Sequence, residues 1–116
     1  MAVTHEEVEQ FALSFPEAYL DHPWGESVVK VGKRIFVFVG QSPEGVTVTV
    51  KVPQDVLELW EHRADTFRPA YVGRYGWIGL YVRSSDAWQT AQEGIALSYQ
   101  IIAPKRLSGA VRPHRT

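Results

Sequence analysis

Residues 67–82 read F-R-P-A-Y-V-G-R-Y-G-W-I-G-L-Y-V, and this stretch decides the fold because strand and turn signals meet in it. Its second half alternates, since Trp77 and Tyr81 point to one face of a strand and Ile78 and Leu80 to the other. Both faces are apolar or aromatic. Such a strand either packs inside a core or presents a recognition surface, and residue chemistry leaves both interpretations open.

Further strands are expected on either side of this alternation. Ser27–Val31 and residues 34–39 flank Gly32-Lys33, a two-residue link typical of a type II′ hairpin. Residues 46–51 alternate valine with polar side chains, which predicts one buried and one solvent-facing side. A short strand around Tyr71 is expected to precede the one around Ile78. In the strand at 34–39, alternation predicts two opposed sets, one of Ile35, Val37 and Val39 and the other of Phe36 and Phe38.

Capping signals and apolar periodicity predict helices. Thr4 and Glu7 form a capping box, Pro53 suits the first position of a second helix, and Ser84 or Ser85 begins a third. The three expected helices span residues 5–14, 53–62 and 85–103.

The order of these elements predicts a single two-layer α+β domain at residues 1–104, in which an antiparallel sheet of four to six strands carries helices mainly on one face. Residues 105–116 are expected to form a basic C-terminal tail. The uncovered sheet face would then leave apolar surface for a partner or ligand. Side chains expected to be buried are Ile35, Phe36, Val37, Trp60, Ile95 and Ile102.

Composition excludes several classes of protein. The net charge of -1 gives no global basic field for nucleic acid, although all thirteen acidic residues precede Pro104 and four basic residues follow it. No apolar run approaches the ~18 residues of a membrane span, and the acidic start is unlike a signal peptide, so a cytoplasmic protein without membrane contact is expected. The absence of cysteine excludes disulfides and thiolate chemistry.

Catalytic motifs are missing from the sequence. The four histidines lack metal-ligand spacing, no serine lies in a G-x-S-x-G elbow, and no glycine-rich loop opens a helix. We therefore expect a protein that is not an enzyme and has no cofactor or metal. What remains is a mixture of cations and aromatic rings on strands and hairpins, which either contacts phosphates and bases or forms core and solvated hairpin ends. These residues are Lys30, Lys33, Arg34, Lys51, Arg68, Arg74, Tyr71, Tyr75 and Trp77.

Three segments taken together resemble the MmcQ/YjbR family of small bacterial proteins. They are residues 19–39 with H-P-W-G and V-G-K-R-I-F, residues 69–82, and residues 98–107 with S-Y-Q-I-I-A-P-K-R-L. The resemblance implies an α+β fold with an outline related to frataxin-like domains, DNA binding through a "double wing" arrangement, and no known catalytic residues. The positions that match the family pattern are His22, Pro23, Trp24, Gly25, Lys33, Phe36, Lys51, Pro69, Tyr71, Trp77, Ser98 and Tyr99.

Three hypotheses of function follow. The first is DNA binding by basic and aromatic strand wings together with the tail. The second is a protein-interaction or dimerisation module that uses the apolar sheet face, and the third is a small-ligand or metal binder with Glu6, Glu9, Glu17 and Asp21 as acidic ligands. The candidate nucleic-acid-binding residues are Lys33, Arg34, Lys51, Arg68, Arg74, Trp77, Lys105 and Arg106.

Overall fold

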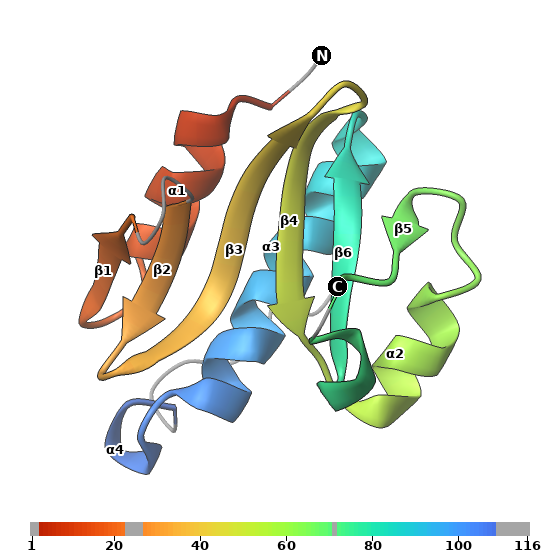
Figure 1. Ribbon diagram of the computed structural model, residues 1–116. Helices are drawn as coiled ribbons and strands as arrows, with labels where there is room; N and C mark the ends of the chain where they lie inside the picture. The colour runs from red at the N-terminus through yellow and green to blue at the C-terminus, as the bar shows by residue number, and fades with distance from the viewer. Residues whose placement is uncertain (1–2, 23–26, 71, 109–116) are drawn as a thin grey trace.

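The computed structural model describes residues 3–22, 27–70 and 72–108. Within these ranges, six strands form one antiparallel sheet in the order β1-β2-β3-β4-β6-β5 (Figure 1). The strands are β1 (Ala18–Asp21), β2 (Ser27–Val31), β3 (Arg34–Ser42), β4 (Gly45–Lys51), β5 (Thr66–Phe67) and β6 (Trp77–Val82). The helices are α1 (His5–Leu13), α2 (Gln54–Trp60), the 3-10 helix η2 (Gly73–Tyr75), α3 (Ser85–Ile102) and α4 (Lys105–Ser108).

The predicted two-layer α+β architecture is confirmed. Helices α1 and α3 lie on the same face of the sheet, while α2 lies beside it near β5 (Figure 1). The capping box of Thr4 and Glu7 is present, and the Ser84 hydroxyl accepts a hydrogen bond from the Ala87 amide at the start of α3. Pro53 lies one position earlier than predicted, as the N-cap of α2. Among the described residues, none of the helices is long and apolar enough to cross a membrane.

The core lies between the sheet and the two covering helices. Phe36 packs against Tyr99 of α3 with ring centroids 5.2 Å apart, and both side chains are fully buried. Five of the six residues predicted to be buried are buried; they are Phe36, Val37, Trp60, Ile95 and Ile102. Ile35 is only half-buried, because it pairs with Lys30 on the opposite side of the sheet from α3.

An irregularity in β3 overturns the predicted alternation of its two phenylalanines. The β2–β3 register passes from Val29↔Val37 to Lys30↔Ile35, which leaves Phe36 as an extra, bulged residue. A bulge interrupts the period of two, so side chains on either side of it no longer alternate. Phe36 therefore points to α3, whereas Phe38 points to the other face and contacts Trp77.

The β2–β3 hairpin confirms the predicted turn. Gly32 has a φ of +64°, and Lys33 does not have a positive φ, which is the combination of a type II′ turn. In β4, Val46, Val48 and Val50 are buried as predicted, whereas Thr49, predicted on the solvent-facing side, is also buried, because it lies between Phe38 and Gly79 within the sheet.

The segment before β6 differs from prediction. Tyr71 lies outside the described residues, so the expected strand centred on it is not tested at that position, and Val72 with η2 forms turns next to it. The strand that pairs with β6 on the side away from β4 is β5, where Phe67 lies opposite Gly79. The start of the predicted basic tail coincides with α4, whose Leu107 is buried against the core, so the packed domain includes α4.

Candidate functional site

The antiparallel order gathers basic side chains at one end of the sheet. β3 begins, β4 ends and β6 begins at this end, with the β2–β3 turn and α4 beside it (Figure 1). We call the six cations there the basic end; they are Lys33, Arg34, Lys51, Arg68, Arg74 and Lys105. Along this end of the sheet, Lys33, Arg34 and Lys105 lie on the side of the β2–β3 turn and α4, whereas Lys51, Arg68 and Arg74 lie at η2 (Figure 1).

Among the described residues, carboxylates neutralise other cations but not these six. In the described part of the chain, Lys30 pairs with Asp21 at 2.9 Å, and Arg63 pairs with two aspartates, while no member of the basic end lies within ion-pair distance of a carboxylate. The basic end is therefore available to an external anion.

Arg106, predicted as a nucleic-acid contact, is instead held by Glu17. The guanidinium makes two hydrogen bonds to the carboxylate, with N–O distances of 2.8 and 2.9 Å. This bond lowers the pKa of Glu17 and raises that of Arg106. The pairing leaves Arg106 with little net charge to offer, so we omit it from the basic end.

Lys51 lies where the basic end meets an aromatic ring. It is directly opposite Trp77 across the β4–β6 pair. The next residue, Val52, donates its amide to the carbonyl of Gly76, and the Lys51 Cε lies 3.8 Å from where a Cβ of Gly76 would be. The aliphatic part of the Lys51 side chain is half-buried against the end of η2, which restricts the position of its ammonium group.

A shallow hollow beside η2 holds two further cations. The Arg68 side chain lies over Gly73, and the Arg74 guanidinium lies 5.1 Å from the ring centroid of Tyr75. Tyr75 is 57% exposed. Two guanidiniums and a phenol around one hollow favour an anionic ligand, because each contributes hydrogen-bond donors and the arginines add positive charge. The hollow is lined by Arg68, Pro69, Val72, Gly73, Arg74 and Tyr75.

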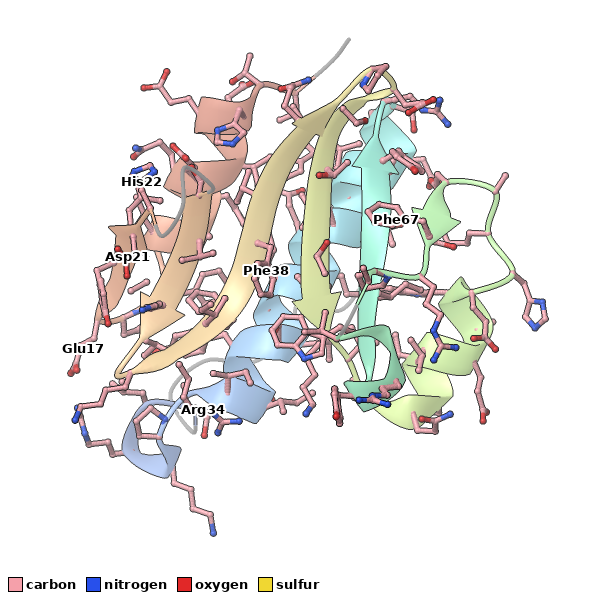
Figure 2. The ribbon with its side chains drawn as sticks, in the orientation of Figure 1. Glu17, Asp21, His22, Arg34, Phe38 and Phe67 are labelled. Atoms are coloured by element: carbon pink, nitrogen blue, oxygen red, sulfur yellow. The ribbon has the colours of Figure 1, made fainter. Side chains whose placement is uncertain are left out.

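The sheet face turned away from α1 and α3 carries aromatic rings. The Phe38 and Trp77 rings meet edge to face with centroids 5.3 Å apart, and the centroids of the Phe67 and Tyr81 rings are 4.6 Å apart. Figure 2 labels Phe38 and Phe67. All four rings are partly exposed. We call this surface the open face; it consists of Phe38, Thr49, Phe67, Trp77, Gly79 and Tyr81. Trp77 also packs against the edge of the core. It therefore combines the two roles that the sequence left open, core packing and exposure on a candidate recognition surface.

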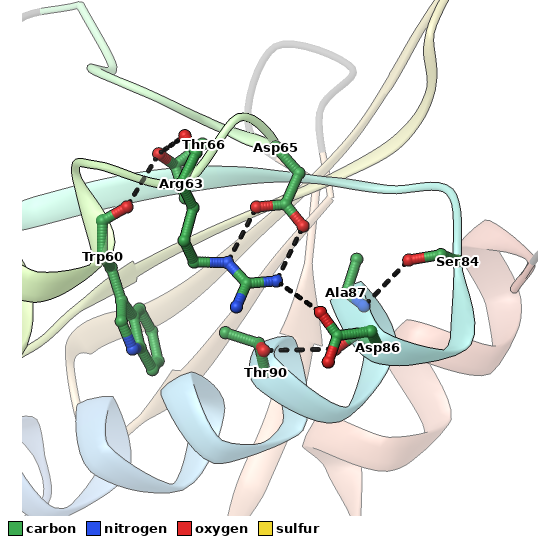
Figure 3. A network of polar contacts seen from close by, with 8 residues as sticks. All are labelled: Trp60, Arg63, Asp65, Thr66, Ser84, Asp86, Ala87 and Thr90. Carbon is green, nitrogen blue, oxygen red and sulfur yellow. Dashed lines mark hydrogen bonds and ion pairs between the residues drawn. The ribbon is translucent and has the colours of Figure 1, made fainter.

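A polar network holds β5 in place beside this face (Figure 3). Arg63 makes two 2.8 Å hydrogen bonds to Asp65 and a third, of 2.9 Å, to Asp86 at the start of α3. The Thr66 hydroxyl lies 3.0 Å from the carbonyl oxygens of both Trp60 and Arg63. These bonds connect the end of α2 to α3 and fix the strand that carries Phe67.

Several positions of the family pattern have structural roles. The Ser98 hydroxyl donates to the Phe36 carbonyl at 2.6 Å and accepts from the Lys51 amide at 3.1 Å. The Tyr99 hydroxyl donates to the Pro16 carbonyl at 2.7 Å. Desolvation by burial raises the pKa of Tyr99. Ser98 and Tyr99 join α3 to the sheet and to the end of α1. This structural role explains their place in the family pattern without any catalytic or binding role.

The other pattern positions lie at the margins of the site. Pro69 lines the hollow, and His22 follows β1 with its Nδ1 3.5 Å from the Ser27 hydroxyl. Outside the described residues lie Pro23, Trp24, Gly25 and Tyr71.

Sequence reasoning missed two contributors to the site. The alternation in residues 34–39 predicts Phe38 on the same face as Phe36, and only a sequence signal for the β-bulge could have separated the two rings. Ser98 was noticed as part of a motif but not as a bridge; a single small polar residue in an otherwise apolar helical stripe is the signal that points to such a role.

The four predicted acidic ligands are not brought together. Asp21 is paired with Lys30, Glu17 with Arg106, and Glu9 lies 3.3 Å from His5. Among the residues that the structure describes, no three histidine, aspartate or glutamate side chains are placed to share a metal ion. Within the described ranges, the four predicted acidic residues therefore do not form a shared metal site.

Comparisons with known proteins identify the family. The family model described as YjbR matches residues 13–101, so the chain belongs to the YjbR family. The crystal structure of Deinococcus radiodurans protein DR2400, described as a DUF419 domain, superimposes with a TM-score of 0.72 at 17% sequence identity, over 94% of this chain and 85% of that one. This likeness supports the fold. No curated protein matches.

Proposed function

We propose that this YjbR-family chain binds nucleic acid through the basic end and does not catalyse a reaction. The observation that carries the proposal is the gathering of six cations that have no carboxylate partner in the described part of the chain. Phosphates are recognised mainly by such lysine and arginine side chains, which set orientation and affinity without reading sequence.

The balance of charge predicts weak binding. The chain has a net charge of -1, and α2, which follows β4, exposes Asp55, Glu58 and its C-cap residue Glu61. The attraction is therefore confined to the basic end, without a field over the whole molecule. If Lys51, Arg68 and Arg74 each contact one phosphate, the log-log salt slope is about -2.1 for a single strand and about -2.7 for a duplex. A fourfold rise in salt then lowers affinity by about 20- to 40-fold.

The test is a titration of fluorescently labelled oligonucleotides with the purified chain, starting at about 50 mM salt. The variant Lys51→Gln/Arg68→Gln/Arg74→Gln is expected to bind more weakly and to show a flatter salt slope. Arg83→Gln is the matched control, because Arg83 is exposed at the opposite end of β6 from Trp77 and is also free of ion pairs among the described residues. Equal binding by the triple variant, or no binding of any oligonucleotide at tens of micromolar protein, would exclude the proposal.

The alternative is a dimerisation or protein-interaction module. It is favoured by one observation, the partly exposed aromatic pair of Phe38 and Trp77 on the open face. Sedimentation velocity separates the two functions. A stable dimer that dissociates in the Trp77→Ala variant would favour the alternative, whereas a monomer at all concentrations supports the open face being free for a nucleic acid.

A further inference from the structure

We infer that the bound nucleic acid is a single strand whose bases stack on Phe38 and Trp77 of the open face while its phosphates lie at Lys51, Arg68 and Arg74. This inference rests on the proposed function and adds the class of nucleic acid and the site of its bases. Neither ring belongs to the helix-facing core in the way that Phe36 does.

The register places rings and cations next to each other. One row of residues crosses all six strands, running Asp21, Val28, Phe38, Thr49, Gly79 and Phe67. Trp77 lies in the neighbouring row, directly opposite Lys51, and follows η2 with its two nearby guanidiniums. A single-stranded nucleic acid whose phosphates lie along η2 and Lys51 thus has the rings of Phe38 and Trp77 next to its bases.

The charges on this face suit a polyanion. Among the described strand positions that share the side of Phe38, the only carboxylate is Asp21, and Lys30 holds it at 2.9 Å. A phosphodiester chain therefore meets aromatic surface edged by cations and no free carboxylate along these strands. An apolar protein partner would leave those cations without a counterpart.

The width of the sheet decides between single strand and duplex. Bases in a duplex expose only their edges in grooves, and the major groove is about 12 Å wide, enough for a helix or a two-stranded ribbon. The open face runs over β3, β4, β6 and the edge strand β5, which at a spacing of about 4.8 Å is roughly 14 Å across, and it belongs to a six-stranded sheet roughly 24 Å wide, so it cannot enter that groove. Only unpaired bases can present their π-faces to Phe38 and Trp77.

The experiment compares three oligonucleotides of about 12 nucleotides, within the range of single-strand site sizes. They are a mixed-sequence single strand, the matched duplex, and an abasic strand with the same number of phosphates. We expect the natural strand to bind tightest and the abasic strand to lose about 5- to 150-fold per stacked base at an unchanged salt slope. The abasic strand needs no protein variant, so it tests stacking even if a substitution in the sheet prevents folding.

Two variants locate the stacking. Trp77→Leu and Phe38→Leu keep an apolar side chain and are each expected to weaken single-strand binding by about 5- to 150-fold without changing the salt slope. Leu59→Ala on α2 removes a side chain that is 70% exposed and is the control with no expected effect. Duplex binding as tight as single-strand binding, or an abasic strand that binds as well as the natural one, would overturn this inference and leave the proposed function standing. Failure of all three oligonucleotides to bind would overturn both.

Discussion

Replacing Ser98 with alanine removes a hydroxyl that completes the sheet. The β3–β4 register ends at Val37↔Val50, so the next pair would be Phe36 with Lys51, but the bulge at Phe36 interrupts the ladder. The hydroxyl bridges the gap, since the Lys51 amide donates to it and it donates to the Phe36 carbonyl. Alanine leaves both backbone groups without this partner in a region where Ser98 itself is 0% exposed.

The cost follows from the two unsatisfied groups. An unpaired buried donor or acceptor costs about 1–3 kcal/mol, so the two groups together should lower the free energy of unfolding by about 2–6 kcal/mol in Ser98→Ala. That is a large fraction of the roughly 5–15 kcal/mol of a typical domain. Urea unfolding followed by circular dichroism measures this loss, and hydrogen exchange at the Lys51 amide should accelerate in the same variant.

The matched control is Ser14→Ala. The Ser14 hydroxyl also donates to a carbonyl, that of Phe11 at 2.6 Å, but at an exposed position where water can replace it. We expect it to change stability by less than about 0.5 kcal/mol. If Ser98→Ala costs no more than Ser14→Ala, the hydroxyl does not bridge the interrupted ladder and the explanation given for its place in the family pattern is wrong.

Two further substitutions test the supports of the open face. Gly79→Ala should destabilise the protein by about 1–3 kcal/mol, because the added Cβ overlaps the Phe67 ring, and urea unfolding should show a much smaller cost in a Phe67→Ala background. An equal cost in both backgrounds would contradict that contact. The hydrogen bond from Arg63 lowers the pKa of Asp65 in the folded protein. The contribution of this pair to stability is therefore complete above the unfolded pKa of about 3.9 and is lost as pH falls through the lower folded pKa. When the pH is lowered from about 5 to about 2, the free energy of unfolding should fall less in Asp65→Asn than in the parent chain, as measured by urea unfolding. An equal fall in both proteins would argue against the pairing.

Local signals predicted the elements well. The capping box at Thr4, the glycine turn at Gly32 and the valine alternation of β4 depend only on neighbouring residues, and each is found as expected. Antiparallel order and helices on one face then follow from short connections and apolar stripes.

Contacts between distant residues could not be predicted in the same way. Arg106 and Glu17 are 89 positions apart, and their pairing depends on α4 folding back towards β1. β5 has only two residues, too few for any periodic signal, although Phe67 is the residue that covers Gly79. Lys33, Arg34 and Lys51 lie on a hairpin or on strands as predicted, whereas Arg74 lies in η2 and Lys105 and Arg106 in α4. Which of these cations stay unpaired in the described part of the chain is decided by such tertiary contacts.

The bulge in β3 connects the core with the candidate site. Without the extra residue, Phe36 and Phe38 would share one face, and the sheet would either crowd α3 with both rings or expose both. With it, Phe36 fills the core against Tyr99 while Phe38 lies beside Trp77. The same interruption leaves the Lys51 amide to Ser98, which holds the end of β4. One irregularity thus places an aromatic ring on the open face and fixes the backbone of the lysine next to it. Removing that irregularity should therefore alter the core and the candidate site together.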